Sequence, residues 1–94
     1  MYVVAIEPMQ DPERSRIERQ AHVAFMARLR EAGQVWAMGI FPDGSGGMAI
    51  LRVGSLEEGR TLMEDDPYVT SGARSLVVYP WEPVPPVEAI GPGT

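Results

Sequence analysis

Short apolar runs and one long segment of helical periodicity make up the first third of the chain. Residues 2–6 are rich in β-forming side chains, and Pro8 and Pro12 limit a strand that begins there. Over residues 14–32, apolar side chains recur at spacings of three and four, which predicts a helix. Gly33 is suited to end that helix as its C-terminal cap. The apolar stripe of this helix consists of Ile17, Ala21, Ala24, Phe25, Leu29 and Ala32.

The next two apolar segments are short and are separated by turn-forming residues. Residues 35–40 predict a second strand, with Trp36 and Met38 on the same face, and residues 48–53 predict a third. Between them, residues 41–47 combine proline, aspartate, serine and glycine, which neither a helix nor a central strand tolerates. We therefore expect the two strands to form a hairpin with a long loop.

The last part of the pattern predicts another helix and another strand. Ser55 and Glu58 have capping-box spacing, so a helix is expected over residues 56–65. Pro67 limits it, because proline disfavours helical geometry in the residue before it. A final strand is expected over residues 75–79. The resulting order is βαββαβ, which predicts a ferredoxin-like α+β domain, a four-stranded antiparallel sheet with two helices on one face.

The length and the composition of the C-terminal segment define the domain. With 94 residues, the chain has room for one domain. Residues 83–94 are rich in proline and glycine, so we expect a folded domain over residues 1–82 and an extended or disordered tail over residues 83–94. A core in so short a chain is marginal, and association with a second subunit is a common remedy.

The expected strands are apolar on both faces, although a two-layer α+β domain buries only one face of its sheet. In the first strand Tyr2, Val4 and Ile6 form one face, and the alternate positions are also apolar. The third and fourth strands share this property. Large exposed apolar patches are rare in monomers, so we expect a homodimer that closes sheet to sheet. A bound lipid-like ligand on this face is the alternative.

Charge and composition exclude several classes of partner. The formal net charge is −5, and the eight basic residues, all arginine, are scattered. Phosphate binding needs clustered cations, so a nucleic-acid partner is not expected. No apolar run approaches the roughly 20 residues of a membrane span, and the first residues lack the basic leader of a signal peptide. Without cysteine there is no disulfide or thiolate site. We expect a cytoplasmic protein with no membrane partner.

The familiar cofactor and nucleophile motifs are absent from the sequence. It holds no phosphate-binding loop of the Walker type, no nucleophile elbow and no paired histidines for zinc. Residues 44–47 are glycine-rich, but they lie between two expected strands and open no helix. A hairpin loop explains them better than a dinucleotide site. We therefore expect neither a cofactor nor a metal.

The only histidine, His22, is a candidate site residue. It shares the helical stripe of Phe25, Met26 and Leu29, at spacings of three, four and seven. A polar ring among apolar neighbours needs a hydrogen-bond partner or a cavity. From the spacing alone, a core histidine satisfied by a backbone carbonyl and a catalytic histidine both remain open.

Asp65 and Asp66 end the second expected helix. An aspartate before a proline is ordinary turn chemistry. Two carboxylates at a helix C-terminus nevertheless oppose the helix dipole, which favours cations there. This cost suggests that at least one of them has another task, such as orienting an imidazole. The aromatic residues remain open between a pocket lining and a core or interface role; they include Trp36, Phe41, Tyr68 and Trp81.

Several segments, in this order and spacing, resemble the YciI-like (YCII-related) family, and together they cover about residues 1–82. The segments are His22-Val23-Ala24-Phe25-Met26 with Leu29, Gly33 and Gly39; Asp43-Gly44-Ser45-Gly46-Gly47 with Met48-Ala49-Ile50-Leu51; Ser55-Leu56-Glu57-Glu58; Asp66-Pro67-Tyr68-Val69 with Gly72; and Val78-Tyr79-Pro80-Trp81. One difference is that the family usually has Gly-Pro soon after the glycine of the second strand, whereas here Gly39 is followed by Ile40-Phe41-Pro42.

The resemblance implies a ferredoxin-like fold that assembles as a dimeric α+β barrel. It also implies that His22 and Asp66 form an active-site pair. Members of the wider superfamily isomerise or dehydrohalogenate small cyclic, often aromatic-derived compounds without a cofactor.

Two functions of different classes follow. The first is a cofactor-independent lyase or isomerase, in which His22 moves a proton on a small cyclic or aromatic-derived substrate and Asp66 orients the imidazole. Trp36, Phe41 and Tyr68 are the expected substrate-binding residues. The second is a non-catalytic protein, binding a small ligand or serving as an accessory subunit, that uses the same pocket. It is favoured by the lack of a nucleophile, metal or cofactor motif.

Overall fold

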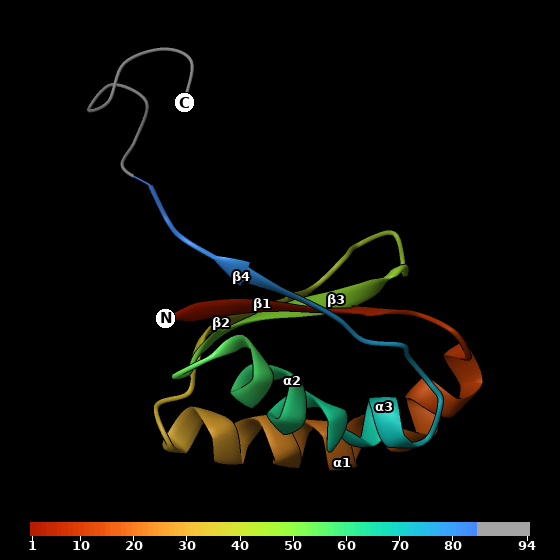
Figure 1. Cartoon of the computed structure of the whole chain (residues 1–94). Helices are drawn as coiled ribbons and strands as arrows, with labels where there is room; N and C mark the ends of the chain where they lie inside the picture. The colour runs from red at the N-terminus through yellow and green to blue at the C-terminus, as the bar shows by residue number, and fades with distance from the viewer. Residues whose placement is uncertain (85–94) are drawn as a thin grey trace.

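The computed structural model describes residues 1–84 and has the expected βαββαβ order with one added short helix (Figure 1). Its four strands form one antiparallel sheet in the order β2-β3-β1-β4. This is the ferredoxin-like arrangement, so the predicted fold class is confirmed. The elements are β1 (Tyr2–Pro8), α1 (Pro12–Glu31), β2 (Val35–Ile40), β3 (Gly46–Arg52), α2 (Leu56–Glu64), α3 (Pro67–Thr70) and β4 (Val77–Trp81).

The hydrophobic core lies between the sheet and the helices, which cover one of its faces (Figure 1). Val3, Ala5 and Leu51 are wholly buried on the sheet side, and Met26 and Met63 meet them from α1 and α2. Burying a large apolar side chain of this kind contributes roughly 1.5–3 kcal/mol. This packing fixes both long helices on the sheet, and with them the side chains that α1 directs toward it.

Helix α1 begins at Pro12, earlier than the expected residue 14. The Asp11 side chain accepts a hydrogen bond from the Arg14 amide at 3.1 Å, and Pro12 fills the first helical position, where a missing N–H costs little. The apolar pattern starts only at Ile17, so the expected bounds left out Pro12 and Glu13. Ile17 itself is exposed, whereas the polar Ser15 is buried.

A bulge in β2 changes which side chains share a face. The pairing with β3 shifts register between Val35 and Ala37, so Trp36 is the extra residue. Trp36 therefore lies on the face away from the helices, and Met38 lies on the helix-covered face, paired with the buried Ala49. The expectation that Trp36 and Met38 share a face is wrong, because strict alternation does not survive an inserted residue.

The sheet face opposite the helices, called the open face below, is apolar, as the two-faced strand pattern predicted. Tyr2, Trp36 and Trp81 form an aromatic cluster on it, with ring centroids 5.9 to 6.2 Å apart. Trp36 is 50% exposed and Tyr79 is 54% exposed in the single chain. The open face consists of Tyr2, Val4, Ile6, Trp36, Met48, Ile50, Val77, Tyr79 and Trp81.

Helix α3 replaces the simple turn expected after the second helix. Asp66 has extended backbone geometry, as a residue before proline should, and its side chain accepts a hydrogen bond from the Tyr68 amide at 3.1 Å. Pro67 then opens a new helical turn. Asp66 is therefore an N-cap, and this local role fixes its side chain on the helix-covered side of the sheet.

The C-terminal tail that the sequence predicts begins at residue 83, and residues 85–94 lie outside the described residues. No helix within residues 1–84 combines the length and the apolar character that a membrane crossing requires.

Candidate functional site

A cavity of about 410 Å³ opens between α1 and the helix-covered side of the sheet. It also reaches the chain around α3, so segments far apart in the sequence contribute to one wall. Its polar lining combines one imidazole, one carboxyl group, three guanidinium groups and the hydroxyl groups of one serine and one tyrosine, Tyr68. The other groups belong to Glu7, Ser15, Arg16, Arg19, His22 and Arg74.

The apolar lining of this cavity is rich in methionine. The chain has six methionines, and four of them, Met9, Met26, Met38 and Met63, line the cavity from the helix-covered side of the sheet. Methionine side chains are flexible and polarisable, and they make favourable contacts with aromatic rings. The lining therefore suits a flat, unsaturated ligand.

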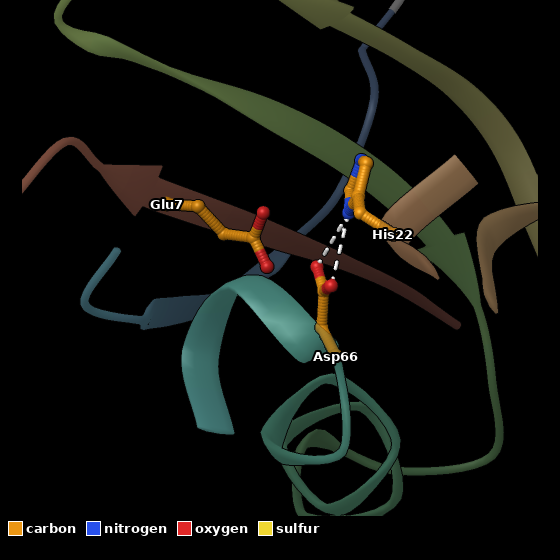
Figure 2. A group of neighbouring side chains, drawn as sticks. All are labelled: Glu7, His22 and Asp66. Atoms are coloured by element: carbon orange, nitrogen blue, oxygen red, sulfur yellow. Dashed lines mark hydrogen bonds and ion pairs between the residues drawn. The ribbon is translucent and has the colours of Figure 1, made fainter. Parts of the chain in front are cut away.

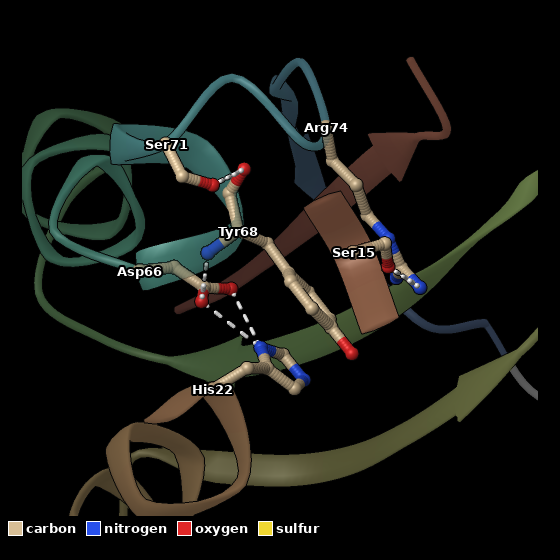
Figure 3. Close-up of polar contacts among 6 residues, drawn as sticks. All are labelled: Ser15, His22, Asp66, Tyr68, Ser71 and Arg74. Atoms are coloured by element: carbon tan, nitrogen blue, oxygen red, sulfur yellow. Dashed lines mark hydrogen bonds and ion pairs between the residues drawn. The ribbon is translucent and has the colours of Figure 1, made fainter. Parts of the chain in front are cut away.

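His22 projects from α1 into this cavity, with only 14% of its side chain exposed. Its Nδ1 lies 2.9 Å from both carboxylate oxygens of Asp66 (Figure 3). When Asp66 is ionised, Nδ1 must carry a proton and donate it to the carboxylate. Nε2 is then the nitrogen left for a ligand in the cavity.

Asp66 is wholly buried and holds its position through several hydrogen bonds. Burial alone would raise its pKa. Hydrogen bonds from His22, Glu7 and the Tyr68 amide, with the charge of the imidazole, outweigh that effect and lower the pKa of Asp66 below its ordinary value. The carboxylate is therefore the stable form, suited to fix the tautomer of the imidazole. Asp65, the neighbouring candidate, is exposed at the C-cap of α2.

Glu7 is a third ionisable member of the site that the sequence did not single out. It is 4% exposed on β1, and its carboxyl group points toward Asp66 and His22 (Figure 2). Burial, the hydrogen bond with the Asp66 carboxyl group and the charge of that group raise the pKa of Glu7 to about 9, although Arg74 partly opposes this. Its position offered a signal, because Glu7 continues the alternation of the buried Val3 and Ala5.

Tyr68 lies between two cationic or basic groups at the cavity wall. Its ring stacks on the His22 imidazole with a centroid separation of 4.0 Å, and the Arg74 guanidinium lies 4.1 Å from its centroid (Figure 3). Arg74 also donates a hydrogen bond to the Ser15 hydroxyl at 3.3 Å. Arg74 and Ser15 carry no motif, and only the fold shows that they belong to this site.

The structure thus brings together three of the five site residues expected from the sequence, His22, Asp66 and Tyr68. It does not bring Trp36 or Phe41 to them. Trp36 lies on the open face because of the bulge in β2, and neither residue lines the cavity. Ile40 lines the cavity instead. It follows Gly39, at the position where this sequence departs from the Gly-Pro pattern described above.

One cluster offers the atoms of a metal site. Glu7, His22 and Asp66 each present one ligand-type atom, and these atoms lie within 4.8 Å of one another. However, both Asp66 oxygens already contact His22 Nδ1, and one of them also accepts from the Tyr68 amide. These contacts already use part of the hydrogen-bonding capacity of the Asp66 carboxylate.

Known proteins resemble this chain in both fold and sequence. The solved structure of 5-chloro-2-hydroxyhydroquinone dehydrochlorinase (TftG) from Burkholderia phenoliruptrix AC1100, in complex with 2,5-dihydroxybenzoquinone, has a TM-score of 0.76. The match covers 87% of this chain and 94% of that one, at 18% identity, and shows a shared fold. The uncharacterised protein YjpA of Bacillus subtilis (strain 168) is 28% identical over 82 residues, which is 87% of this chain and 96% of YjpA.

The sequence also matches the model of a protein family. The match spans residues 1–82, which includes every helix and strand described above, and the family is that of the YCII-related domain. A match over most of the chain, together with the shared fold, shows that this protein belongs to the YCII-related domain family.

Proposed function

We propose that this protein is a cofactor-independent lyase or isomerase that moves a proton on a small cyclic or aromatic-derived substrate, with His22 as the general base and acid. We base this on the contact of 2.9 Å between His22 Nδ1 and the buried Asp66 carboxylate. Such a carboxylate holds the imidazole in one tautomer and stabilises the imidazolium that forms when Nε2 takes a proton.

The proton transfer needs only groups of this chain. Nε2 removes a proton from a ring hydroxyl or from carbon beside a carbonyl, and Asp66 offsets the charge gained by the imidazole. Tyr68, stacked on His22, would contact the bound ring beside the reacting atom. A positioned acid–base group of this kind contributes about 10²–10⁴-fold in rate.

The lining of the cavity favours a substrate that develops negative charge. Arg16, Arg19 and Arg74 line it, and they would stabilise a phenolate or enolate formed by proton removal. TftG shares the fold and is a dehydrochlorinase of a chlorinated, hydroxylated ring. Loss of hydrogen chloride removes one proton and one chloride without net oxidation, so a single positioned base is a suitable catalyst.

Two compounds from that comparison test the proposal. Binding of 2,5-dihydroxybenzoquinone would be measured by calorimetry, and chloride release from 5-chloro-2-hydroxyhydroquinone would be followed directly, for the wild type, His22→Ala and Asp65→Asn. We expect His22→Ala to lower chloride release by about 10²–10⁴-fold and the exposed Asp65→Asn to leave it unchanged. Chloride release unaffected by His22→Ala would sink the proposal. Binding that depends on His22 without any product would favour the non-catalytic alternative.

We also propose that the chain works as a homodimer closed through its open face. Nine apolar or aromatic side chains lie there, and several are about half exposed in the single chain. A second copy of the same face would bury them and give the sheet-to-sheet packing of an α+β barrel. The cytoplasmic location expected from the sequence stays a prediction.

A further inference from the structure

Glu7 occupies an unusual position for a glutamate, on a buried strand position beside another carboxyl group. It is 4% exposed, whereas glutamate is almost never fully buried unless it is paired. One of its oxygens, Oε2, is buried and has no hydrogen-bond partner among the described residues. The Asp66 carboxyl group lies next to Glu7, and one oxygen of each group lies within 4.8 Å of the other (Figure 2).

Two ionised carboxylates cannot be stable in this contact. Both would be acceptors, both would carry negative charge, and neither could satisfy the other. A proton between them removes the repulsion and provides the missing donor. Asp66 already accepts hydrogen bonds from His22 and from the Tyr68 amide, which favour its ionised form, so the proton belongs on Glu7.

We infer that Glu7 is a positioning residue of this site: as a neutral acid, it donates a hydrogen bond to Asp66 and so keeps that carboxylate ionised and directed at His22. The contribution of Glu7 to catalysis rests on the proposed function. Glu7 would then belong to a row of three groups, neutral acid, carboxylate and imidazole, that ends at the cavity.

The charged and titratable groups around Glu7 come from three segments. His22 faces it from α1, Asp66 and Tyr68 from the start of α3, and Arg74 from the segment before β4. The adjacent strand β3 presents Gly47 opposite Glu7 and so offers no side chain. Among the described residues that line the cavity, no other carries a carboxyl group.

Ionisation of Glu7 would change the site at high pH. A second negative charge beside Asp66 would remove its donor and separate the two carboxylates, so the imidazole would lose its fixed partner. The site therefore has an upper pH limit, near pH 9, that is set by Glu7.

Infrared and NMR spectroscopy of the full chain test this inference without a substrate. The infrared C=O band of a protonated carboxylic acid should be present at neutral pH in the wild type. It should be absent from Glu7→Gln and retained in the matched control Glu64→Gln, which changes an exposed glutamate of α2. The ¹⁵N signals of the His22 ring should change in a step centred at about pH 9 in the wild type, and this step should be missing in Glu7→Gln.

A positioning role also predicts rescue by the conservative variant. Glu7→Gln still offers a donor to Asp66, so the ring signals of His22 at neutral pH should match the wild type, whereas Glu7→Ala should shift them. On a substrate that the protein turns over, Glu7→Ala should cost about ten- to a hundredfold in kcat, and Glu7→Gln little. If Glu7→Ala fails to fold, the infrared band and the pH step still test the inference, because both compare the wild type with Glu7→Gln.

Other results would overturn the inference. The protonated-carboxyl band could be missing from the wild type, or it could persist in Glu7→Gln. Addition of Zn²⁺ could abolish the band and shift the His22 signals at stoichiometric concentration, which would assign the cluster to a metal instead. The two results on the carboxyl band would leave the proposed role of His22 unchanged, because that role is tested by the activity of His22→Ala. The zinc result would also count against a base that works without a metal.

Discussion

At the scale of single residues, two carboxyl groups in contact have pKa values displaced in opposite directions. Glu7 holds its proton far above its ordinary range, and Asp66 loses its proton below it. Burial raises the pKa of both groups. Only Asp66, however, accepts hydrogen bonds from His22 and from the Tyr68 amide. This asymmetry decides which of the two carries the charge.

The stability of the fold should therefore decrease with pH through Glu7. Between its ordinary pKa of 4.5 and its folded value of about 9, the folded state holds a proton that the unfolded chain has lost. The slope is up to about 1.4 kcal/mol per pH unit. Urea unfolding at about pH 5, 7 and 9 should show this decrease in the wild type and not in Glu7→Gln. Parallel curves for the two proteins would contradict it.

Asp66 contributes in the opposite sense. Its folded pKa lies below the ordinary 3.8, so its stabilisation is present above that value and is lost as the pH falls through the folded pKa. Asp66→Ala should lower the free energy of unfolding by about 2–4 kcal/mol at neutral pH, because it removes the cap of α3 and the partner of His22. Asp65→Ala, at an exposed neighbouring position, should cost less than about 0.5 kcal/mol in the same urea titration.

At the scale of helices and strands, hydrophobic periodicity predicted every long element and missed the short or irregular ones. The stripe through Phe25 and Leu29 and the capping spacing of Ser55 and Glu58 are local signals, and both survive in the structure. Helix α3 is too short to have a period. The bulge at Trp36 exists only in relation to β3, so no pattern within β2 could reveal it.

The site shows the same division between local and non-local information. The apolar stripe of the helix is enough to make His22 a candidate site residue. Asp66 is predicted as its partner by the family resemblance of the sequence. Arg74 carries no local signal, and Glu7 only its place in the alternation of β1, because the role of each residue depends on contacts with residues more than half of the chain away. Glu7 lies on β1, and the pairing of β1 within the sheet places its carboxyl group within 4.8 Å of Asp66.

The turn that enters β3 should be sensitive to substitution, because it packs against the backbone of Glu7. Gly46 has a φ of 133°, and a Cβ there would lie 2.1 Å from the backbone oxygen of Glu7. Gly46→Ala should cost about 3 kcal/mol and displace Glu7. Gly44 has a φ of 82° but open space around it, so Gly44→Ala should cost only about 1 kcal/mol. Thermal unfolding and the His22 ring signals would compare the two; equal effects would rule out the close approach.

At the scale of the whole molecule, the two faces of the sheet have different tasks. One packs on the helices and carries the cavity, and the open face presents aromatic side chains that the single chain leaves partly exposed. The sequence predicted this second apolar face, because apolar and polar residues do not alternate along the strands.

The proposed homodimer gives a direct prediction for this face. Tyr79→Glu should convert the dimer to a monomer in sedimentation analysis, because it would bury charge in an apolar interface. Ile17→Glu changes an apolar residue of α1 that is at least as exposed as Tyr79 but lies outside the open face, and it should leave the dimer intact. A wild-type monomer, or a dimer that survives Tyr79→Glu, would contradict the interface.

The most direct measurement of the central claim is the ¹⁵N NMR spectrum of the His22 ring, since the chain has a single histidine. In mildly alkaline solution, where histidine side chains are ordinarily neutral, we predict one tautomer with the proton on Nδ1. Asp66→Asn should change this spectrum and Asp65→Asn should not, and 2,5-dihydroxybenzoquinone should perturb Nε2. A proton on Nε2, or a spectrum indifferent to Asp66→Asn, would contradict a base held by Asp66 and open to the cavity.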